Sequence, residues 1–167
     1  FKEFTNITLY PFAIYKHNGK LVLSNAEAST FVSELPASPA LINDKYKQDI
    51  TKNVEVDCRL FSEIDEGDID LLSVDTEGCE WYVLETMKSR PKILSIETHG
   101  KFYVNPFIEN VNQWIIENGY KEWYKDKSDT VYFKIGIFNL SLFEKIQLLI
   151  MNYYIKIRRA KRIFYKK

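Results

Sequence analysis

No two of the six glycines in this 167-residue sequence stand close together. A nucleotide-binding turn needs several glycines within a few residues, because only glycine lets the backbone approach a ligand so closely. No segment of the chain is therefore predicted to form such a turn by itself.

Cysteine is equally scarce, and neither sign of charge is in excess. Cys58 and Cys79 are the only two cysteines, which excludes a disulfide framework and a zinc site built on paired cysteines. Lys plus Arg and Asp plus Glu both number 23, so we expect no nucleic-acid partner. Unpaired cysteines are consistent with a reducing compartment, and we expect a cytoplasmic protein. A hydrophobic share of 46% is enough for the core of one folded domain.

The most informative segment is residues 69–99, IDLLSVDTEGCEWYVLETMKSRPKILSIETH. Residues 69–74 form an apolar run too short for a helix, which predicts a strand buried on both faces. Val83, Leu84 and Met87 share one face at helical spacing, which predicts a helix over residues 79–88. Residues 92–96 predict the next strand. The order strand, helix, strand implies a right-handed parallel crossover.

Acidic and imidazole side chains follow both predicted strands. Asp75 and Glu77 come after the first strand, and Glu97 and His99 end the second. Ligands bind at this edge of open α/β sheets, so we expect a ligand or catalytic site there. The alternative is structural: Asp75 could cap the helix, and Glu77 and Glu80 could complement its dipole.

The runs IDLLSVDTEGCEWYVLETM and PKILSIETH resemble the core signature of the FkbM-type methyltransferases. Members of that family carry an apolar strand, the pattern Asp-x-Glu-Gly-x-Glu, a helix with a Val-Leu pair, and a strand ending in Glu. The resemblance extends upstream to NITLYPFAIYKHNGKLVL and downstream to WIIENGYKEWY and DTVYFKI. The matching motif residues are Asp75, Glu77, Gly78, Glu80, Val83, Leu84 and Glu97.

This resemblance implies an α/β fold, a Rossmann-like class I methyltransferase sheet with helices on both faces. It implies S-adenosylmethionine as cofactor and O-methylation of a hydroxyl on a sugar, glycan or small-molecule acceptor. Asp75 would lie near the cofactor's methionine end, and Glu97 and His99 would be candidates to accept the proton. The catalytic candidates are thus Asp75, Glu97 and His99, and the cofactor-binding candidates are Phe12, Ala13, Asp75, Glu77 and Gly78, with Phe12 and Ala13 bordering the adenine.

The sequence departs from the family at its start, because the first strands and the glycine-rich loop of such domains are missing. We therefore expect residues 1–139 to be an N-terminally incomplete methyltransferase domain that is inactive alone. The competing hypothesis is a non-catalytic, methyltransferase-like interaction module that has lost cofactor binding. A metal-dependent hydrolase using Asp75, Glu77, Glu97 and His99 is a weaker alternative. No dedicated metal site is predicted, because one histidine near the motif and no HExxH-like spacing give little support for one.

Residues 140–167 form a basic and apolar tail, with eight lysines and arginines against the single Glu144. The uncharged run over residues 146–155 is about half of the roughly 20 residues that a membrane span needs. A basic amphipathic helix is typical of a peripheral membrane contact or a partner-binding surface. It is also compatible with a terminal helix packed on its own domain.

The remaining elements are predicted from turn signals and periodicity. Residues 7–10 are expected to form a strand, residues 12–16 and 20–24 a hairpin around Asn18-Gly19, and residues 54–58 an edge strand. A short helix is expected over residues 60–64, and a longer one from Asn105-Pro106 to Gly119. Residues 120–124 and 130–135 are expected to pair as antiparallel strands.

Overall fold

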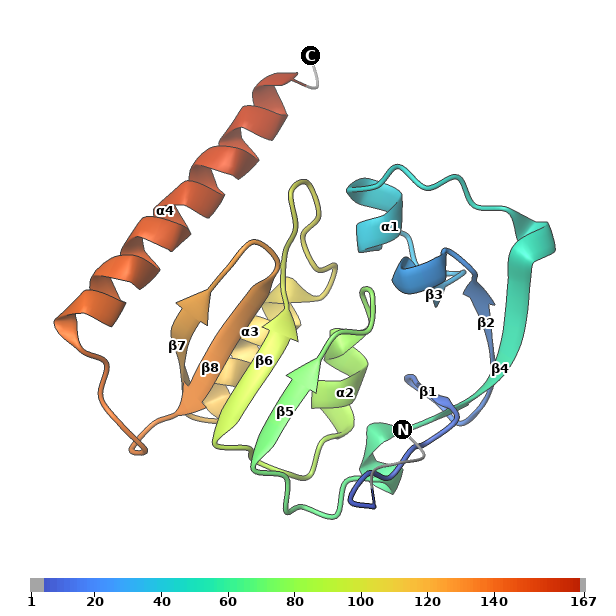
Figure 1. Cartoon of the computed structure of the whole chain (residues 1–167), viewed down its shortest axis with the longest axis horizontal. Helices are drawn as coiled ribbons and strands as arrows, with labels where there is room; N and C mark the ends of the chain where they lie inside the picture. Colours follow the sequence, from blue (N-terminus) through green and yellow to red (C-terminus); the bar gives the residue numbers. More distant parts are fainter. Residues whose placement is uncertain (1–4, 166–167) are drawn as a thin grey trace.

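The described part of the chain folds into two mixed four-stranded sheets with helices packed against them (Figure 1). The computed structural model describes the backbone of residues 5–165 and the side chains of residues 5–158 and 160. The α/β class is confirmed, but the single sheet predicted from the sequence is wrong. The strands before the acidic motif pair with one another and form a sheet of their own.

The first sheet has the strand order β1-β4-β2-β3. β4 lies between β1 and β2, parallel to the first and antiparallel to the second. Cys58 on β4 is therefore opposite both Ala13 and Gly19. The strands are β1 (Ala13–Ile14), β2 (Gly19–Ser24), β3 (Phe31–Val32) and β4 (Asn53–Arg59).

The hairpin predicted around Asn18-Gly19 is wrong, and β4 is not the edge strand expected there. The side-chain oxygen of Asn18 accepts a 2.9 Å hydrogen bond from the amide of Leu60, just beyond β4. The turn thus holds the end of β4 in place, and β2 pairs along β4 over six residues. Residues 7–10, predicted as a strand, form none.

Short helices connect the strands of this first half. A helix was expected over residues 60–64, and η3 lies within that range. Ser38 caps α1, since its hydroxyl oxygen accepts a hydrogen bond from the amide of Leu41. The connecting helices are η1 (Glu27–Ser29), α1 (Pro39–Ile42), η2 (Ile50–Lys52) and η3 (Phe61–Glu63).

The second sheet has the strand order β5-β6-β8-β7, and it contains the predicted crossover. β5 and β6 pair in parallel and α2 connects them, while β7 and β8 form the expected antiparallel pair. One face of this sheet buries Leu94 and Ile96 against Leu84 of α2 and Val111 of α3. The elements are β5 (Leu71–Val74), α2 (Glu80–Thr86), β6 (Ile93–Glu97), α3 (Ile108–Glu117), β7 (Tyr120–Lys125) and β8 (Asp129–Lys134).

A second apolar cluster joins the first sheet to α2. The ring of Tyr15 packs edge-on against Tyr82 of α2, with 5.0 Å between the ring centroids. Cys58 of β4 and Cys79, just before α2, are buried in the same cluster. Both cysteines therefore pack in the core, and the first sheet is fixed beside the acidic turn that follows β5.

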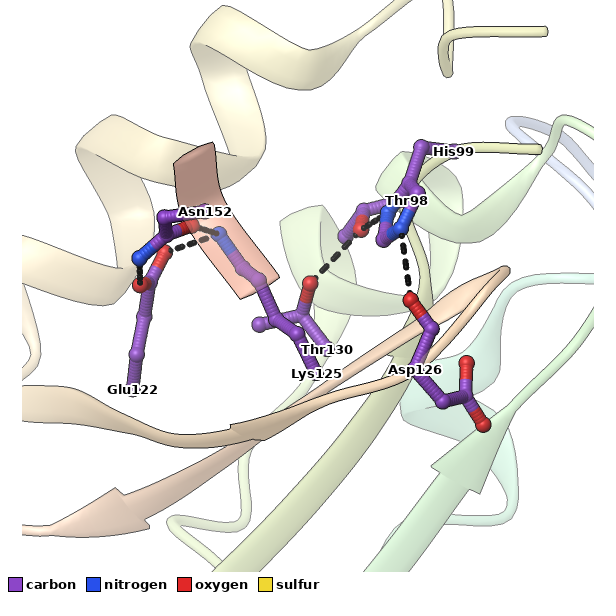
Figure 2. Close-up of polar contacts among 7 residues, drawn as sticks. All are labelled: Thr98, His99, Glu122, Lys125, Asp126, Thr130 and Asn152. Atoms are coloured by element: carbon purple, nitrogen blue, oxygen red, sulfur yellow. Dashed lines mark hydrogen bonds and ion pairs between the residues drawn. The ribbon is translucent and has the colours of Figure 1, made fainter. Parts of the chain in front are cut away.

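The C-terminal helix α4 (Leu142–Tyr165) contacts the second sheet at β7 and extends away from it (Figure 1). Its first turn is stabilised by Ser141 and Glu144, whose side chains each accept a hydrogen bond from the other's amide. Lys125 of β7 donates to the side-chain oxygen of Asn152 at 2.9 Å (Figure 2). Within the described part of the chain, no helix is long and apolar enough to cross a membrane.

Candidate functional site

The turn after β5 has a constrained backbone. Glu77 has φ +54°, a left-handed conformation that is uncommon outside glycine, and Gly78 follows with φ +108°. Such conformations cost of the order of 1–3 kcal/mol for a non-glycine residue and persist where the surroundings hold them. The surroundings here are the side chain of Glu80 and the packing around it.

Glu80 holds the turn from the first residue of α2, where it is completely buried. Its Oε1 accepts hydrogen bonds from the amide of Thr76 at 2.9 Å and from the amide of Gly78 at 3.1 Å. The Thr76 hydroxyl donates to the same oxygen at 3.1 Å. Glu80 therefore does more than complement the helix dipole: it fixes the shape of the turn that presents Asp75 and Glu77.

Asn105 connects this turn to the end of the neighbouring strand. Its side-chain amide donates to Oε2 of Glu80, and its backbone amide donates to the Thr98 carbonyl at 3.1 Å. Its side-chain oxygen accepts a hydrogen bond from the amide of Phe107 at 2.8 Å. Asn105 thus orders the chain that precedes α3 and couples the two strand ends that carry the acidic residues. The helix start predicted at Asn105-Pro106 is wrong, because α3 begins at Ile108 and its N-cap is Phe107.

The fold brings together carboxylates from both strand ends. One oxygen of Asp75, one of Glu80 and one of Glu97 lie within 4.8 Å of one another. Burial, followed by the charges of Glu80 and Asp75, raises the pKa of Glu97 to about 9. Burial and the neighbouring Asp75 raise the pKa of Glu77 to about 7, and burial and Asp129 raise that of Asp75. Without a cation nearby, these groups hold protons more tightly than ordinary carboxyl groups do.

Tyr103 adds a buried hydroxyl to this acidic cluster. The residue is 1% exposed, and its hydroxyl has no hydrogen-bond partner among the described residues. The hydroxyl lies 3.3 Å from the position that a Cβ on Gly78 would occupy. Burial and then the charges of Glu80 and Glu97 raise the pKa of Tyr103, which places its oxygen in the field of the cluster.

A cavity of about 420 Å³ opens between the first sheet and the turn after β5. Its size is within the range of small-molecule binding sites. Strands of the first sheet supply an apolar wall, and the turn supplies a polar wall with Asp75, Thr76 and Glu77. A larger cavity of about 610 Å³ lies between β7 and α4, but it contains none of the strand-end carboxylates. The smaller cavity is therefore the candidate functional site.

Four of the five predicted cofactor-binding residues line this smaller cavity. Phe12 and Ala13 lie on one wall, and Asp75 and Glu77 lie on the other. Gly78 is buried behind the turn, where a Cβ would lie 3.1 Å from the Ala37 carbonyl oxygen. Its role is to let the turn pack closely against the chain behind it.

His99 lies apart from the cavity, in a hydrogen-bonded chain of its own (Figure 2). The ring is 2% exposed, and its Nε2 lies 3.1 Å from the carbonyl oxygen of Asp126. Because a carbonyl can only accept, Nε2 carries the hydrogen, and Nδ1 can accept from the Thr98 hydroxyl 2.8 Å away. Thr98 continues the chain to Thr130 at 2.7 Å. This arrangement favours a positioning role over proton transfer, and the catalytic role of His99 stays a prediction.

A family model described as the methyltransferase FkbM domain matches residues 4–122, which is more than half of the chain. No curated protein and no solved structure matches the chain.

Proposed function

The chain belongs to the FkbM methyltransferase family, and we propose that it serves S-adenosylmethionine-dependent methylation of a hydroxyl group on a sugar, glycan or small-molecule acceptor. The observation that carries this proposal is the 420 Å³ cavity, which is lined by Asp75 and Glu77 as well as by Phe12 and Ala13. In this proposal the second sheet corresponds to the later strands of a Rossmann-like methyltransferase sheet.

The walls of the cavity suit the two ends of this cofactor. Phe12, Ala13 and Leu21 offer apolar surface to an adenine ring. Glu77 has a buried oxygen, Oε2, without a partner among the described side chains, and it can accept hydrogen bonds from ribose hydroxyls. When bound, the cofactor supplies a methyl group on a positively charged sulfonium.

Asp75 is the carboxylate that an acceptor can reach, because it is exposed while Glu80 is buried. Its charge can hold an acceptor hydroxyl in the orientation that transfer requires. A carboxylate oxygen of Glu97 lies within 4.8 Å of one of Asp75, and the raised pKa of Glu97 makes its ionised form a stronger base than an ordinary carboxylate. We assign orientation to Asp75 and, in the protein without a bound cation, proton acceptance to Glu97.

The second candidate function is a non-catalytic interaction module that uses α4. The observation favouring it is a row of exposed apolar side chains along that helix. Leu149 is 69% exposed and Tyr153 is 68% exposed, which is unusual for a helix that only covers its own domain. The two functions differ in whether the cavity binds the cofactor.

Calorimetry with S-adenosylmethionine tests the proposal in the whole protein that contains these residues. Ala13→Trp places a large ring in the cavity, and we expect it to weaken binding at least about tenfold. The matched control is Val54→Trp, on the exposed side of β4, which leaves the cavity unchanged. Failure of the unmutated protein to bind the cofactor, or equal binding by both variants, would contradict the proposal.

A further inference from the structure

Asp75, Glu80 and Glu97 have the composition and spacing of a cation site. One oxygen from each lies within 4.8 Å of the other two, close enough for a single ion to contact all three. The three carboxylates come from the turn after β5, the start of α2 and the end of β6. Acidic residues often gather at surfaces without binding anything, so proximity alone does not define a site.

Two buried oxygens give independent evidence that something else binds here. Tyr103 is 1% exposed, and its hydroxyl has no hydrogen-bond partner in the described part of the protein. Oε2 of Glu97 is also buried without a partner there. A buried polar group left unpaired costs about 1–3 kcal/mol. The Tyr103 hydroxyl lies 3.3 Å from the position that a Cβ on Gly78 would occupy, and the amide of Gly78 donates to Glu80. The hydroxyl therefore lies beside the cluster, where one ligand can satisfy both oxygens.

We propose that Asp75, Glu80 and Glu97 bind one divalent cation, Mg²⁺ or Mn²⁺, with the Tyr103 hydroxyl contacting water held by the ion. All three ligands are carboxylates, which hard divalent cations prefer. Mg²⁺ keeps several water molecules when protein carboxylates bind it, and those waters supply the partner that Tyr103 lacks. The sequence alone predicted no dedicated metal site, because one histidine near the motif and no HExxH-like spacing gave little support for one, and a metal-dependent hydrolase using Asp75 and Glu97 was only a weaker alternative.

The surroundings of Glu80 resemble those of a supported metal ligand. Its Oε1 already accepts three hydrogen bonds, but its Oε2 accepts one, from Asn105, and keeps a lone pair for an ion. Hydrogen bonds of this kind orient ligating carboxylates in metal sites. Asp75 is the exposed ligand and also lines the cavity, so the ion would be reached from the cavity.

The site has a consequence for the proposed function, on which this part of the inference rests. An ion at the polar wall can coordinate the oxygen of an acceptor hydroxyl and lower its pKa. Acceptors with two neighbouring oxygen atoms, such as vicinal diols of sugars, can coordinate through both. The substrate class therefore narrows to such oxygen-rich acceptors.

Manganese binding to the metal-stripped protein tests the site directly, by the loss of the electron paramagnetic resonance signal of free Mn²⁺. We expect one Mn²⁺ per protein, displaced by Mg²⁺, and at least about tenfold weaker binding in Asp75→Asn and in Glu97→Gln. The matched control is Asp70→Asn, which removes an exposed carboxylate near the opposite end of β5 and should bind normally. No binding by the unmutated protein, or equal binding by all the variants, would overturn the site.

Tyr103→Phe supplies a second test that does not depend on loss of folding. If the hydroxyl contacts ion-bound water, the variant binds Mn²⁺ several-fold more weakly but is no less stable without the ion. Unchanged Mn²⁺ affinity in this variant would remove Tyr103 from the proposal. Manganese binding without any methyl transfer would support the cation site and contradict the proposed methyltransferase activity. Methyl transfer that a chelator does not affect, in a protein that binds no Mn²⁺, would support the activity and contradict the cation site.

Discussion

Replacing Asp65 by asparagine should destabilise the protein strongly although the two side chains have the same shape. Asp65 is 1% exposed, and its carboxylate accepts four hydrogen bonds. Oδ2 accepts from the amides of Lys88 at 2.6 Å and Ser89 at 2.7 Å, and Oδ1 accepts from the amide of Gly67 at 2.9 Å and from the Ser89 hydroxyl. This carboxylate ties the approach to β5 to the chain leaving α2.

Asparagine has one oxygen where aspartate has two, so at least one of these donors must face its NH₂ group. The less costly orientation of the asparagine side chain places its NH₂ group at the position of Oδ1. The Gly67 hydrogen bond is then lost, whereas the Ser89 hydroxyl can turn and accept a hydrogen bond from the NH₂ group. A hydrogen bond to a charged group contributes about 1.5–3 kcal/mol, and the unpaired donor adds about 1–3 kcal/mol. We expect Asp65→Asn to lower the free energy of unfolding by about 3 kcal/mol, or about 6–12 °C in melting temperature.

The pH dependence of this difference has a defined sign. Burial alone would raise the pKa of Asp65, but the hydrogen bonds from Ser89, Gly67 and Lys88 outweigh it and lower the pKa. Because the pKa of Asp65 is lower in the folded state, the carboxylate stabilises that state at any pH above its pKa in the unfolded chain, about 3.9. This stabilisation is lost as the pH falls through the pKa of the folded state. The stability difference should be complete at neutral pH and shrink in acid below about pH 4.

Urea unfolding of the protein and the variant across this pH range measures both effects. Asp70→Asn is the control, because Asp70 is 78% exposed and its pair with Lys92 is worth about 0–1 kcal/mol. A loss below about 1 kcal/mol for Asp65→Asn, within the range of an ordinary hydrogen bond, would refute the reasoning. So would a stability difference that stays constant down to pH 3.

Three further outcomes are expected. Asp75→Asn should reduce methyl transfer by the whole protein about a hundredfold or more, with little change in melting temperature. Retained activity with lowered stability would leave Asp75 with a structural role in the turn after β5; it does not cap α2, whose N-cap is Cys79. Gly78→Ala should destabilise the protein by about 1–3 kcal/mol in thermal unfolding, because φ is +108° and the new methyl would meet the Ala37 carbonyl oxygen at 3.1 Å. If α4 binds membranes, flotation should show the protein on anionic but not neutral vesicles at low salt, and replacing the exposed Leu149 and Ile150 by serine should abolish it. Equal behaviour on both vesicle types would leave α4 without this role.

The strands and helix around the acidic motif were predictable because their signals are local. The apolar run before Asp75 correctly predicted β5, the helical spacing of Val83, Leu84 and Met87 predicted α2, and residues 92–96 predicted β6. Their boundaries shifted by no more than two residues, since the ends of helices and strands carry the weakest local signals. The antiparallel pair β7–β8 was confirmed for the same reason, because a short polar turn separates its strands.

The first sheet was not predictable in this way, because its pairing depends on residues distant in the sequence. Asn18-Gly19 is a strong hairpin signal, and no local feature shows that Asn18 binds the amide of Leu60 instead. The same limit applies to the site. Glu80 belongs to a recognisable motif. The loop before α3 brings Asn105 to Glu80 and Tyr103 to Gly78, and the sequence of that loop carries no signal of either contact.

The position of β4 between β1 and β2 also affects the order of folding. Ala13 pairs with Cys58, and Ser24 pairs with Asn53, so the first sheet forms only after the long intervening segment has closed. Pairings between distant residues form slowly, because the entropy of loop closure is lost before the contacts form. The β5–α2–β6 unit relies on nearer neighbours and is expected to form earlier. The acidic turn therefore belongs to the faster-folding half and the apolar wall of the cavity to the slower one, so that the binding site is completed only in the last stage of folding.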